Sequence, residues 1–179
     1  MTGELLFTVL VLAVGGERLA ELRVSRRNAA WSLARGGVES GAGHYPVMVV
    51  LHTGLLLGAL TEVWLRRPDV PVELAAPMLA LALGAQALRW WCIATLGPRW
   101  NTRVIVVPGM PLVASGPYRW IRHPNYVAVV IEGFALPLVH AAWITAAVFT
   151  VANAFLMVVR IRAENRALEA AAGPPGAAP

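Results

Sequence analysis

The chain has 179 residues, enough for one ordinary domain, and 58% of them are hydrophobic while only 14% are charged. Soluble proteins contain roughly 45–50% apolar residues and about 25% charged residues, and one core in a chain of this size cannot bury so much apolar surface. The composition therefore argues against a soluble enzyme and predicts an all-α integral membrane protein embedded in a lipid bilayer. The formal net charge of +5 comes from arginines dispersed among apolar segments, so we expect no nucleic acid partner. A single cysteine argues against a cysteine-based metal site, and we expect no metal.

Five apolar segments predict membrane-embedded helices within a single domain of residues 1–170. They cover about residues 5–22, 46–64, 74–96, 126–138 and 141–168. At 1.5 Å per residue, the second and third are long enough to cross a hydrocarbon layer of roughly 30 Å. The last apolar stretch is too long for one span, and Pro137 divides it into a short helix and a full one. The alanine, glycine and proline composition of residues 171–179 predicts a disordered tail.

The positions of the arginines predict the orientation in the membrane. They gather after the first helix, between the third and fourth helices, and near the C-terminus, whereas the opposite side carries only Arg66 and Arg67. With about five transmembrane helices, the three arginine-rich segments share one side, which the positive-inside rule makes cytoplasmic. We therefore expect a multi-pass protein of the cell (inner) membrane, with the N-terminus outside and the C-terminus cytoplasmic.

The segment 96–126 is rich in arginine and aromatic residues and ends where the fourth helix begins. Pro124 suits the first position of a helix, and the free backbone N–H groups of a first helical turn attract anions. Arg119 and Arg122 add positive charge beside that turn. These features indicate a site for a small carboxylate or phosphate ligand. The alternative is a membrane-surface loop whose arginines contact lipid headgroups.

The order of residues in this segment matches a known pattern. Gly116-Pro117-Tyr118-Arg119 and Arg122-His123-Pro124-Asn125-Tyr126 resemble the GPYR and RHPxY motifs of the isoprenylcysteine carboxyl methyltransferase family. The resemblance extends upstream to residues 96–102 and downstream to residues 160–168, which are similar to the RIxxEExxL ending of that family. Asn165 departs from the pattern, because it stands at the second acidic position of the ending.

The resemblance implies an integral membrane enzyme that uses S-adenosylmethionine, with its cofactor site on the cytoplasmic side. It places His123, Tyr126 and Glu164 at the cofactor, and Arg160 with Glu164 near the transferred methyl group. The full set of predicted cofactor-binding residues is Tyr118, Arg119, Arg122, His123, Pro124, Tyr126 and Glu164. Because Arg160 and Glu164 lie one helical turn apart, an ordinary surface ion pair is the alternative for these two.

The predicted helices each carry a polar residue about 8–10 Å below the cytoplasmic surface. These residues are Glu17, His52, Gln86, Glu132 and Asn153. Polar residues at membrane depth are functional candidates, and we interpret them as an acceptor pocket in which Glu132 or His52 takes the proton of the acceptor. Asn153 would contact the substrate. Hydrogen bonding between helices is the alternative role for the whole layer.

Residues 26–52 predict a connecting segment of varied composition that leads into the second helix. This stretch resembles a bacterial branch of the same family that O-methylates alkylpyrones or alkylresorcinols beside type III polyketide synthases. The resemblance makes Glu39 and His44 substrate-contacting candidates and implies a functional link to such a synthase. For His44, capping of the second helix or a place among the lipid headgroups is the alternative.

The expected function is therefore transfer of a methyl group from S-adenosylmethionine to an oxygen of a lipophilic small molecule. The acceptor oxygen belongs to a hydroxyl or a carboxylate. All 15 residues counted as Lys or Arg are arginines, and alanine is frequent. Such a composition is typical of a GC-rich bacterium, and it favours a polyketide phenol or pyrone over a prenylcysteine as the methyl acceptor. The alternatives are a phospholipid N-methyltransferase, a sterol-type reductase that binds NADPH, and a non-catalytic membrane scaffold.

Overall fold

The computed structural model describes residues 1–172 and is built mainly of helices. The five α-helices are α1 (Thr2–Leu33), α2 (Tyr45–Arg66), α3 (Val72–Leu96), α4 (Pro124–Leu138) and α5 (Trp143–Ala172). Three short 3-10 turns are η1 (Ala42–His44), η2 (Gly97–Arg99) and η3 (Gly116–Arg119). The predicted all-α class therefore holds for the described residues, apart from one small ribbon of two strands. The predicted tail lies almost wholly outside the described residues.

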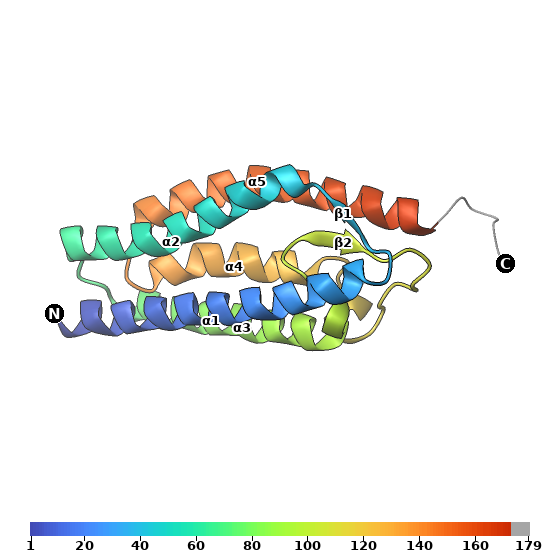
Figure 1. Ribbon diagram of the computed structural model, residues 1–179. Coiled ribbons are helices and arrows are strands. Elements are labelled where there is room, and N and C mark those ends of the chain that lie inside the picture. The colour runs from blue at the N-terminus through green and yellow to red at the C-terminus, as the bar shows by residue number, and fades with distance from the viewer. Residues whose placement is uncertain (173–179) are drawn as a thin grey trace.

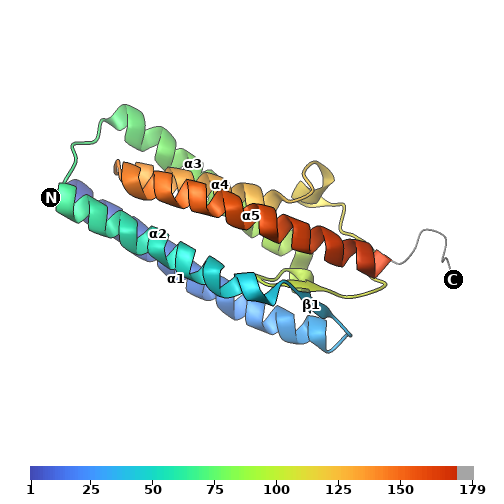
Figure 2. The ribbon, with the colours of Figure 1, turned by 90° about the horizontal axis from the view of Figure 1, so that it is seen from above.

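The helices run side by side along one axis (Figure 1). The N-terminus and the α2–α3 and α4–α5 connections lie at one end, and the strands and the long segment between α3 and α4 lie at the other (Figures 1 and 2). α4 packs between α3 and α5, while α2 packs on α5 and on α1. The three arginine-rich segments consequently share one end of the molecule. Which side of a membrane that end faces stays a prediction.

Three helices are long and apolar enough to cross a membrane: Ala42–Arg66, Val72–Arg99 and Trp143–Ala171. α4 is apolar but only 15 residues long. α1 has 32 residues, but charged side chains are frequent in its second half. The described helices thus support a membrane protein, and the count of five spans stays a prediction.

α1 is much longer than predicted, because it continues through residues 23–33 instead of ending at residue 22. The added turns are amphipathic in an unusual way: Ser25, Asn28 and Ser32 are buried, while the neighbouring arginines are exposed. The apolar run predicts an end near residue 22, just before the first arginines of this segment. The buried polar face instead binds the segment after α3. Tertiary contacts therefore stabilise residues 23–33 as a helix, although their polar and charged side chains do not suit a lipid environment.

Two side chains show what the added turns of α1 bind. Asn28 Nδ2 donates to the carbonyl oxygens of Gly97 (3.0 Å) and Trp100 (2.8 Å). The Ser25 hydroxyl lies 2.8 Å from the Thr102 hydroxyl and accepts a hydrogen bond from Thr102 N at 3.0 Å. Residues 97–102 are therefore fixed against α1 before the chain enters strand β2.

The ribbon joins the two connecting segments at this end of the molecule. β1 (Val38–Ser40) and β2 (Val104–Val106) pair antiparallel, with Glu39 opposite Ile105. Arg103 Nη1 lies 3.4 Å from Glu39 Oε2, next to the ribbon. Backbone hydrogen bonds in the ribbon thereby hold the α1–α2 connection close to the segment that leads towards α4.

Gly133 lies where α4 crosses α5, and we expect its substitution by alanine to destabilise the protein. A Cβ atom at this position would collide with the Phe149 ring of α5. Overpacking of this kind costs about 1–3 kcal/mol, which thermal unfolding in detergent would report as a lower melting temperature. Gly54→Ala in α2 is the matched control, because no atom lies within 4 Å of its Cβ. Equal melting temperatures of the two variants would contradict this account.

Candidate active site

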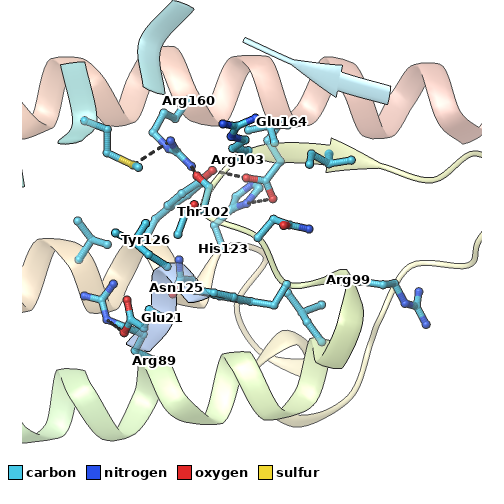
Figure 3. Close-up of a pocket in the computed structure, with 18 of the residues that line it drawn as sticks. Glu21, Arg89, Arg99, Thr102, Arg103, His123, Asn125, Tyr126, Arg160 and Glu164 are labelled. Carbon is cyan, nitrogen blue, oxygen red and sulfur yellow. Dashed lines mark hydrogen bonds and ion pairs between the residues drawn. The ribbon is translucent and has the colours of Figure 1, made fainter. Parts of the chain in front are cut away.

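A cavity of about 460 Å³ connects the middle of the helices with the segment between α3 and α4 (Figure 3). One part of its wall is polar and comes from that segment, α4 and α5. The polar residues include Thr102, Tyr118, His123, Asn125, Tyr126, Arg160 and Glu164. Another part is apolar and comes from α1 and α2. Its residues include Gly15, Leu19, Leu22, Val49, Leu56 and Leu57. A molecule with a polar head and an apolar tail fits this distribution.

The start of α4 and the end of α5 meet at the polar part of the cavity. The Tyr126 hydroxyl donates to Glu164, and His123 Nδ1 lies 3.5 Å from Glu164 Oε1. The rings of His123 and Tyr126 are stacked, with centroids 5.5 Å apart. His123 Nε2 donates to Asn165 Oδ1 at 3.1 Å. Asn165, which departs from the family pattern, is therefore a neutral acceptor for the histidine that also contacts Glu164.

Arg160 reaches the same site from α5, one helical turn before Glu164. It is only 4% exposed. Its Nη2 donates to the Thr102 carbonyl oxygen at 2.9 Å, and its Nη1 lies 3.0 Å from Met48 Sδ. The guanidinium carbon is 5.7 Å from the centroid of the Tyr126 ring. Within the described residues Arg160 and Glu164 form no ion pair with each other, so both are available to a ligand beside Tyr126.

The pairing of His123 with Glu164 predicts a pH-dependent contribution to stability. The hydrogen bond to the Glu164 carboxylate raises the pKa of His123 above its usual value, although burial opposes this. A raised pKa in the folded state means that the contribution is complete below the unfolded pKa of about 6.5 and is lost as pH rises through the folded pKa. We expect His123→Gln to lower the melting temperature more at about pH 6 than at about pH 9. An equal or larger difference at the higher pH would refute this.

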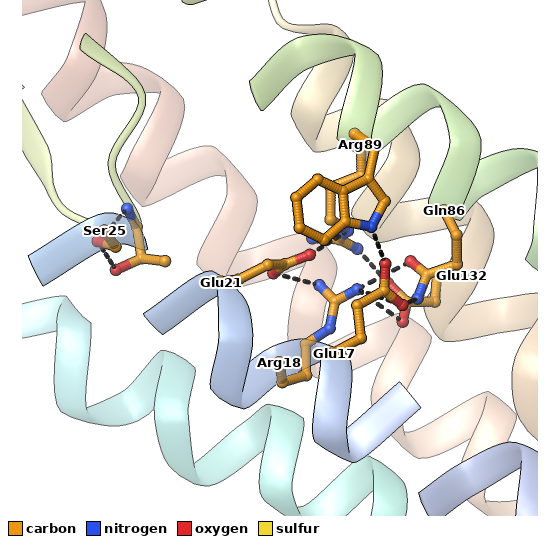
Figure 4. Close-up of polar contacts among 9 residues, drawn as sticks. Glu17, Arg18, Glu21, Ser25, Gln86, Arg89 and Glu132 are labelled. Atoms are coloured by element: carbon orange, nitrogen blue, oxygen red, sulfur yellow. Dashed lines mark hydrogen bonds and ion pairs between the residues drawn. The ribbon is translucent and has the colours of Figure 1, made fainter. Parts of the chain in front are cut away.

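A buried charge cluster lies beside the cavity, between α1, α3 and α4 (Figure 4). It consists of Glu17, Arg18, Glu21, Arg89 and Glu132, with Gln86 and Trp90 as hydrogen-bonding neighbours. Three of the five residues of the predicted polar layer, Glu17, Gln86 and Glu132, therefore do come together.

Sequence reasoning missed the arginines and Glu21 of this cluster. Arg18 and Glu21 are three residues apart on α1, with Nη1 and Oε2 at 2.8 Å, and Arg89 donates to Glu132. The available signal was the alternation of acidic and basic residues within one turn of α1, together with a lone arginine near the end of α3.

His52 and Asn153, the other two residues of the predicted layer, stand apart from the charge cluster. His52 lines the cavity and donates from Nδ1 to the Met48 carbonyl oxygen at 2.8 Å. Asn153 is buried, and its Oδ1 has no hydrogen-bond partner within the described residues. Neither forms a hydrogen bond to Glu132 in the described part of the chain.

Residues 78–170, from within α3 to near the end of α5, match the isoprenylcysteine carboxyl methyltransferase (ICMT) family. The chain belongs to the ICMT family. The resemblance that we inferred from the motifs is thereby confirmed, whereas the alkylpyrone branch stays a prediction.

Two bacterial relatives extend the similarity over most of the chain. The uncharacterized protein YpbQ of Bacillus subtilis (strain 168) is 38% identical over 164 residues, which cover 92% of this chain and 97% of that protein. An uncharacterized protein of Haemophilus influenzae is 24% identical over 153 residues, 84% of this chain and 88% of that protein. The heme-binding subunit MsrQ of a protein-methionine-sulfoxide reductase from Agrobacterium fabrum is similar only locally, with 37% identity over 33% of this chain.

The polar part of the cavity fits the S-adenosylmethionine that ICMT family enzymes generally use. Trp100 Nε1, both amide atoms of Asn101 and Asn125 Oδ1 are buried and have no hydrogen-bond partner within residues 1–172. All three residues line the cavity. Unpaired buried polar atoms are costly, so a ligand that carries both donors and acceptors suits them. For a metal the described residues offer no group of three His, Cys, Asp or Glu side chains.

The remaining residues predicted for the ICMT-like site lie at its edges or outside it. Tyr118 lines the cavity, and burial raises its pKa, which keeps its hydroxyl protonated. Pro124 is buried at the first turn of α4. The other predicted residues are absent from the cavity wall described here: Arg119, Arg122, Glu39, His44, Glu132 and Asn153.

Proposed function

We propose that this protein transfers the methyl group of S-adenosylmethionine to an oxygen of a lipophilic acceptor. One observation carries the proposal: His123, Tyr126 and Glu164, which come from two motifs far apart in the chain, meet in a cavity that also has an apolar wall. A cofactor and a lipid-like acceptor would thus share one enclosed space.

Cofactor binding would use the polar part of the cavity. When bound, the cofactor supplies a methyl group that is already activated on a sulfonium. Glu164 would accept hydrogen bonds from ribose hydroxyls, since a carboxylate has about four acceptor sites and Tyr126 and His123 use only part of them. The free N–H groups of the first turn of α4 would attract the amino acid carboxylate. Trp100 and Tyr118 would flank the adenine.

Acceptor binding would use the apolar wall between α1 and α2. Near the N-terminus these helices pack closely, through Phe7 and Val11 against Ala59 and Val63. Further along, the cavity-lining residues Leu19 and Leu57 are 59% and 60% exposed, so the cavity opens to the outer surface. An acyl tail entering there from the bilayer would bring its head towards Tyr126. Enclosure and alignment of the reacting atoms supply most of the rate in such a transfer.

A polyketide phenol or pyrone hydroxyl is the acceptor that we propose, with a type III polyketide synthase as the enzyme that supplies it. The support is the bacterial character of the composition, together with the apolar tail site. In this proposal the helices span the inner membrane, and the cofactor site faces the cytoplasm because the arginine-rich segments gather at that end.

Calorimetric titration of the detergent-purified protein with S-adenosylhomocysteine, and in parallel with NADPH, tests the cofactor. We expect micromolar binding of S-adenosylhomocysteine alone. Binding of NADPH alone would move the protein to the reductases, and binding of neither would favour the scaffold. Transfer of radiolabelled methyl groups to phosphatidylethanolamine, but to no oxygen acceptor, would establish N-methylation instead.

A further inference from the structure

The charge cluster beside the cavity carries an unbalanced charge. Its three carboxylates, Glu17, Glu21 and Glu132, face only two guanidinium groups, those of Arg18 and Arg89. Glu21, Arg89 and Glu132 are each at most 5% exposed. Since an uncompensated charge in a buried site is unfavourable, the cluster becomes neutral, and more stable, when one carboxylate takes up a proton.

The contacts of the carboxylate oxygens distinguish the three acids. Glu17 accepts hydrogen bonds on both oxygens, from Gln86 and from Trp90. Glu132 accepts from Arg89, and its other oxygen lies 3.6 Å from Arg18 Nη2.

Glu21 accepts a hydrogen bond on one oxygen only. Its Oε2 is paired with Arg18 Nη1 at 2.8 Å. Its Oε1 is buried and has no hydrogen-bond partner in residues 1–172, with Arg89 Nε at 3.6 Å, beyond hydrogen-bonding distance. Glu21 therefore keeps one oxygen without a hydrogen bond, as Glu132 does at Oε1, and the two acids differ in that Glu21 lines the cavity.

Glu21 is also the acid of the cluster that lines the cavity, together with Arg18 and Arg89. Figure 3 shows Glu21 and Arg89 on the opposite side of Tyr126 from Glu164. An acceptor head beside Tyr126 would thus lie between the cofactor residues and Glu21. The sequence predicts Glu132 or His52 as the base, but Glu132 is not among the cavity-lining residues. His52 does line the cavity, and its Nδ1 donates to Met48, which leaves Nε2 as the acceptor nitrogen. Protonation of His52 would create a further buried cation, whereas protonation of Glu21 removes the surplus negative charge of the cluster.

We propose that Glu21 is the general base of the methyl transfer, an inference that rests on the function proposed above. The O–H bond of the acceptor hydroxyl breaks, and its proton passes to Glu21 Oε1. A lone pair of the oxygen forms the bond to the methyl carbon, while the methyl–sulfur bond breaks and leaves its electron pair on sulfur. The charge cluster is then neutral, so uptake of the proton stabilises it.

Several charged and titratable groups around Glu21 would shape this proton transfer. They are Glu17 and Arg18 on α1, His52 on α2, Arg89 on α3, Glu132 on α4 and Arg160 on α5.

The test uses the full-length protein in detergent, S-adenosylmethionine with a radiolabelled methyl group, and pentadecylresorcinol as the acceptor. We expect Glu21→Gln to lower kcat about 10²- to 10⁴-fold near neutral pH, the usual contribution of a general base. The remaining rate should rise with pH until the phenol itself ionises, near pH 10. The affinity for S-adenosylhomocysteine should stay within about threefold of wild type, a factor worth less than 1 kcal/mol.

Glu62→Gln is the matched control, because Glu62 is also a buried acid but is not among the cavity-lining residues, and it accepts from the backbone N–H groups of Ile144 and Thr145. Its kcat should change only a few-fold, with the pH profile of the wild type. Equal losses in both variants with unchanged pH profiles would show that removal of a buried carboxylate acts through the structure and would overturn the proposal. Wild-type kcat in Glu21→Gln would also overturn it.

A second acceptor separates this inference from the proposed function. N-acetyl-S-farnesylcysteine presents a carboxylate that has no proton to lose near neutral pH. If the wild type methylates this acceptor but not the resorcinol, methyl transfer is confirmed and the role of Glu21 as a base is refuted. Methylation of both acceptors, with only the resorcinol reaction impaired in Glu21→Gln, would support that role. Absence of S-adenosylhomocysteine binding in the wild type would refute the proposed function itself.

Discussion

Replacement of Glu164 by alanine should weaken the binding of S-adenosylhomocysteine by at least about 100-fold. Glu164 lies where α4 and α5 meet, and it accepts from Tyr126 and contacts His123. Each hydrogen bond from a ligand to a charged group contributes about 1.5–3 kcal/mol, so the loss of two ribose contacts costs about 3 kcal/mol, or two orders of magnitude. Calorimetric titration of the detergent-purified variant measures this directly.

Glu169→Ala is the control for this prediction, because Glu169 lies five residues further along α5 and is exposed. It should bind S-adenosylhomocysteine as the wild type does. The same titration would exclude Glu164 from the cofactor site if both variants bound equally well. A melting temperature measured alongside separates loss of the ligand contact from loss of the fold.

Replacement of Arg160 by lysine should lower kcat at least about 100-fold while the protein stays folded. The planar guanidinium contacts the Thr102 carbonyl and Met48 Sδ at the same time and lies over Tyr126. Lysine keeps the charge, but all its N–H donors are on one nitrogen, so it cannot reproduce the planar arrangement of donors on a guanidinium. The acceptor beside Tyr126 would then be misplaced, and a shift of 1 Å is enough to cost about 100-fold in rate.

Arg162→Lys provides the comparison for this second prediction, since Arg162 is exposed on the same helix. Initial rates of radiolabelled methyl transfer to pentadecylresorcinol should remain at wild-type level in this variant. If Arg160→Lys kept the wild-type rate as well, the positive charge alone would suffice for turnover, and the planar shape of the guanidinium would have no role in it.

Local patterns in the sequence predicted the helices at 46–64, 74–96 and 126–138 close to their observed bounds. Hydropathy and the positions of proline are properties of neighbouring residues, so they can be read without a structure. The same reading ended the first helix too early, because the turns that carry Ser25, Asn28 and Ser32 are stabilised by contacts with residues 97–102. A helix held by distant partners has no local hydropathy signal.

For the candidate site, the motifs indicated a set of residues but not the contacts between them. The motif order was enough to indicate the family and to single out His123, Tyr126 and Glu164. The sequence left open whether Arg160 and Glu164 pair with each other, and the structure instead directs both towards Tyr126. It also left Asn165 unexplained, whereas the fold makes it the acceptor for His123.

The sequence by itself therefore determined the helical membrane class, the gathering of the arginine-rich segments and membership of the methyltransferase family. Only the tertiary structure decided which buried acid lines the cavity. Glu17, Glu21 and Glu132 are equivalent in a count of charged residues at membrane depth, yet Glu21 alone among them lines the cavity wall. Which side chain faces the cavity depends on the rotation of α1 about its axis and on its distance from α3 and α4. Contacts between distant segments set these quantities, and no local pattern of residues encodes them.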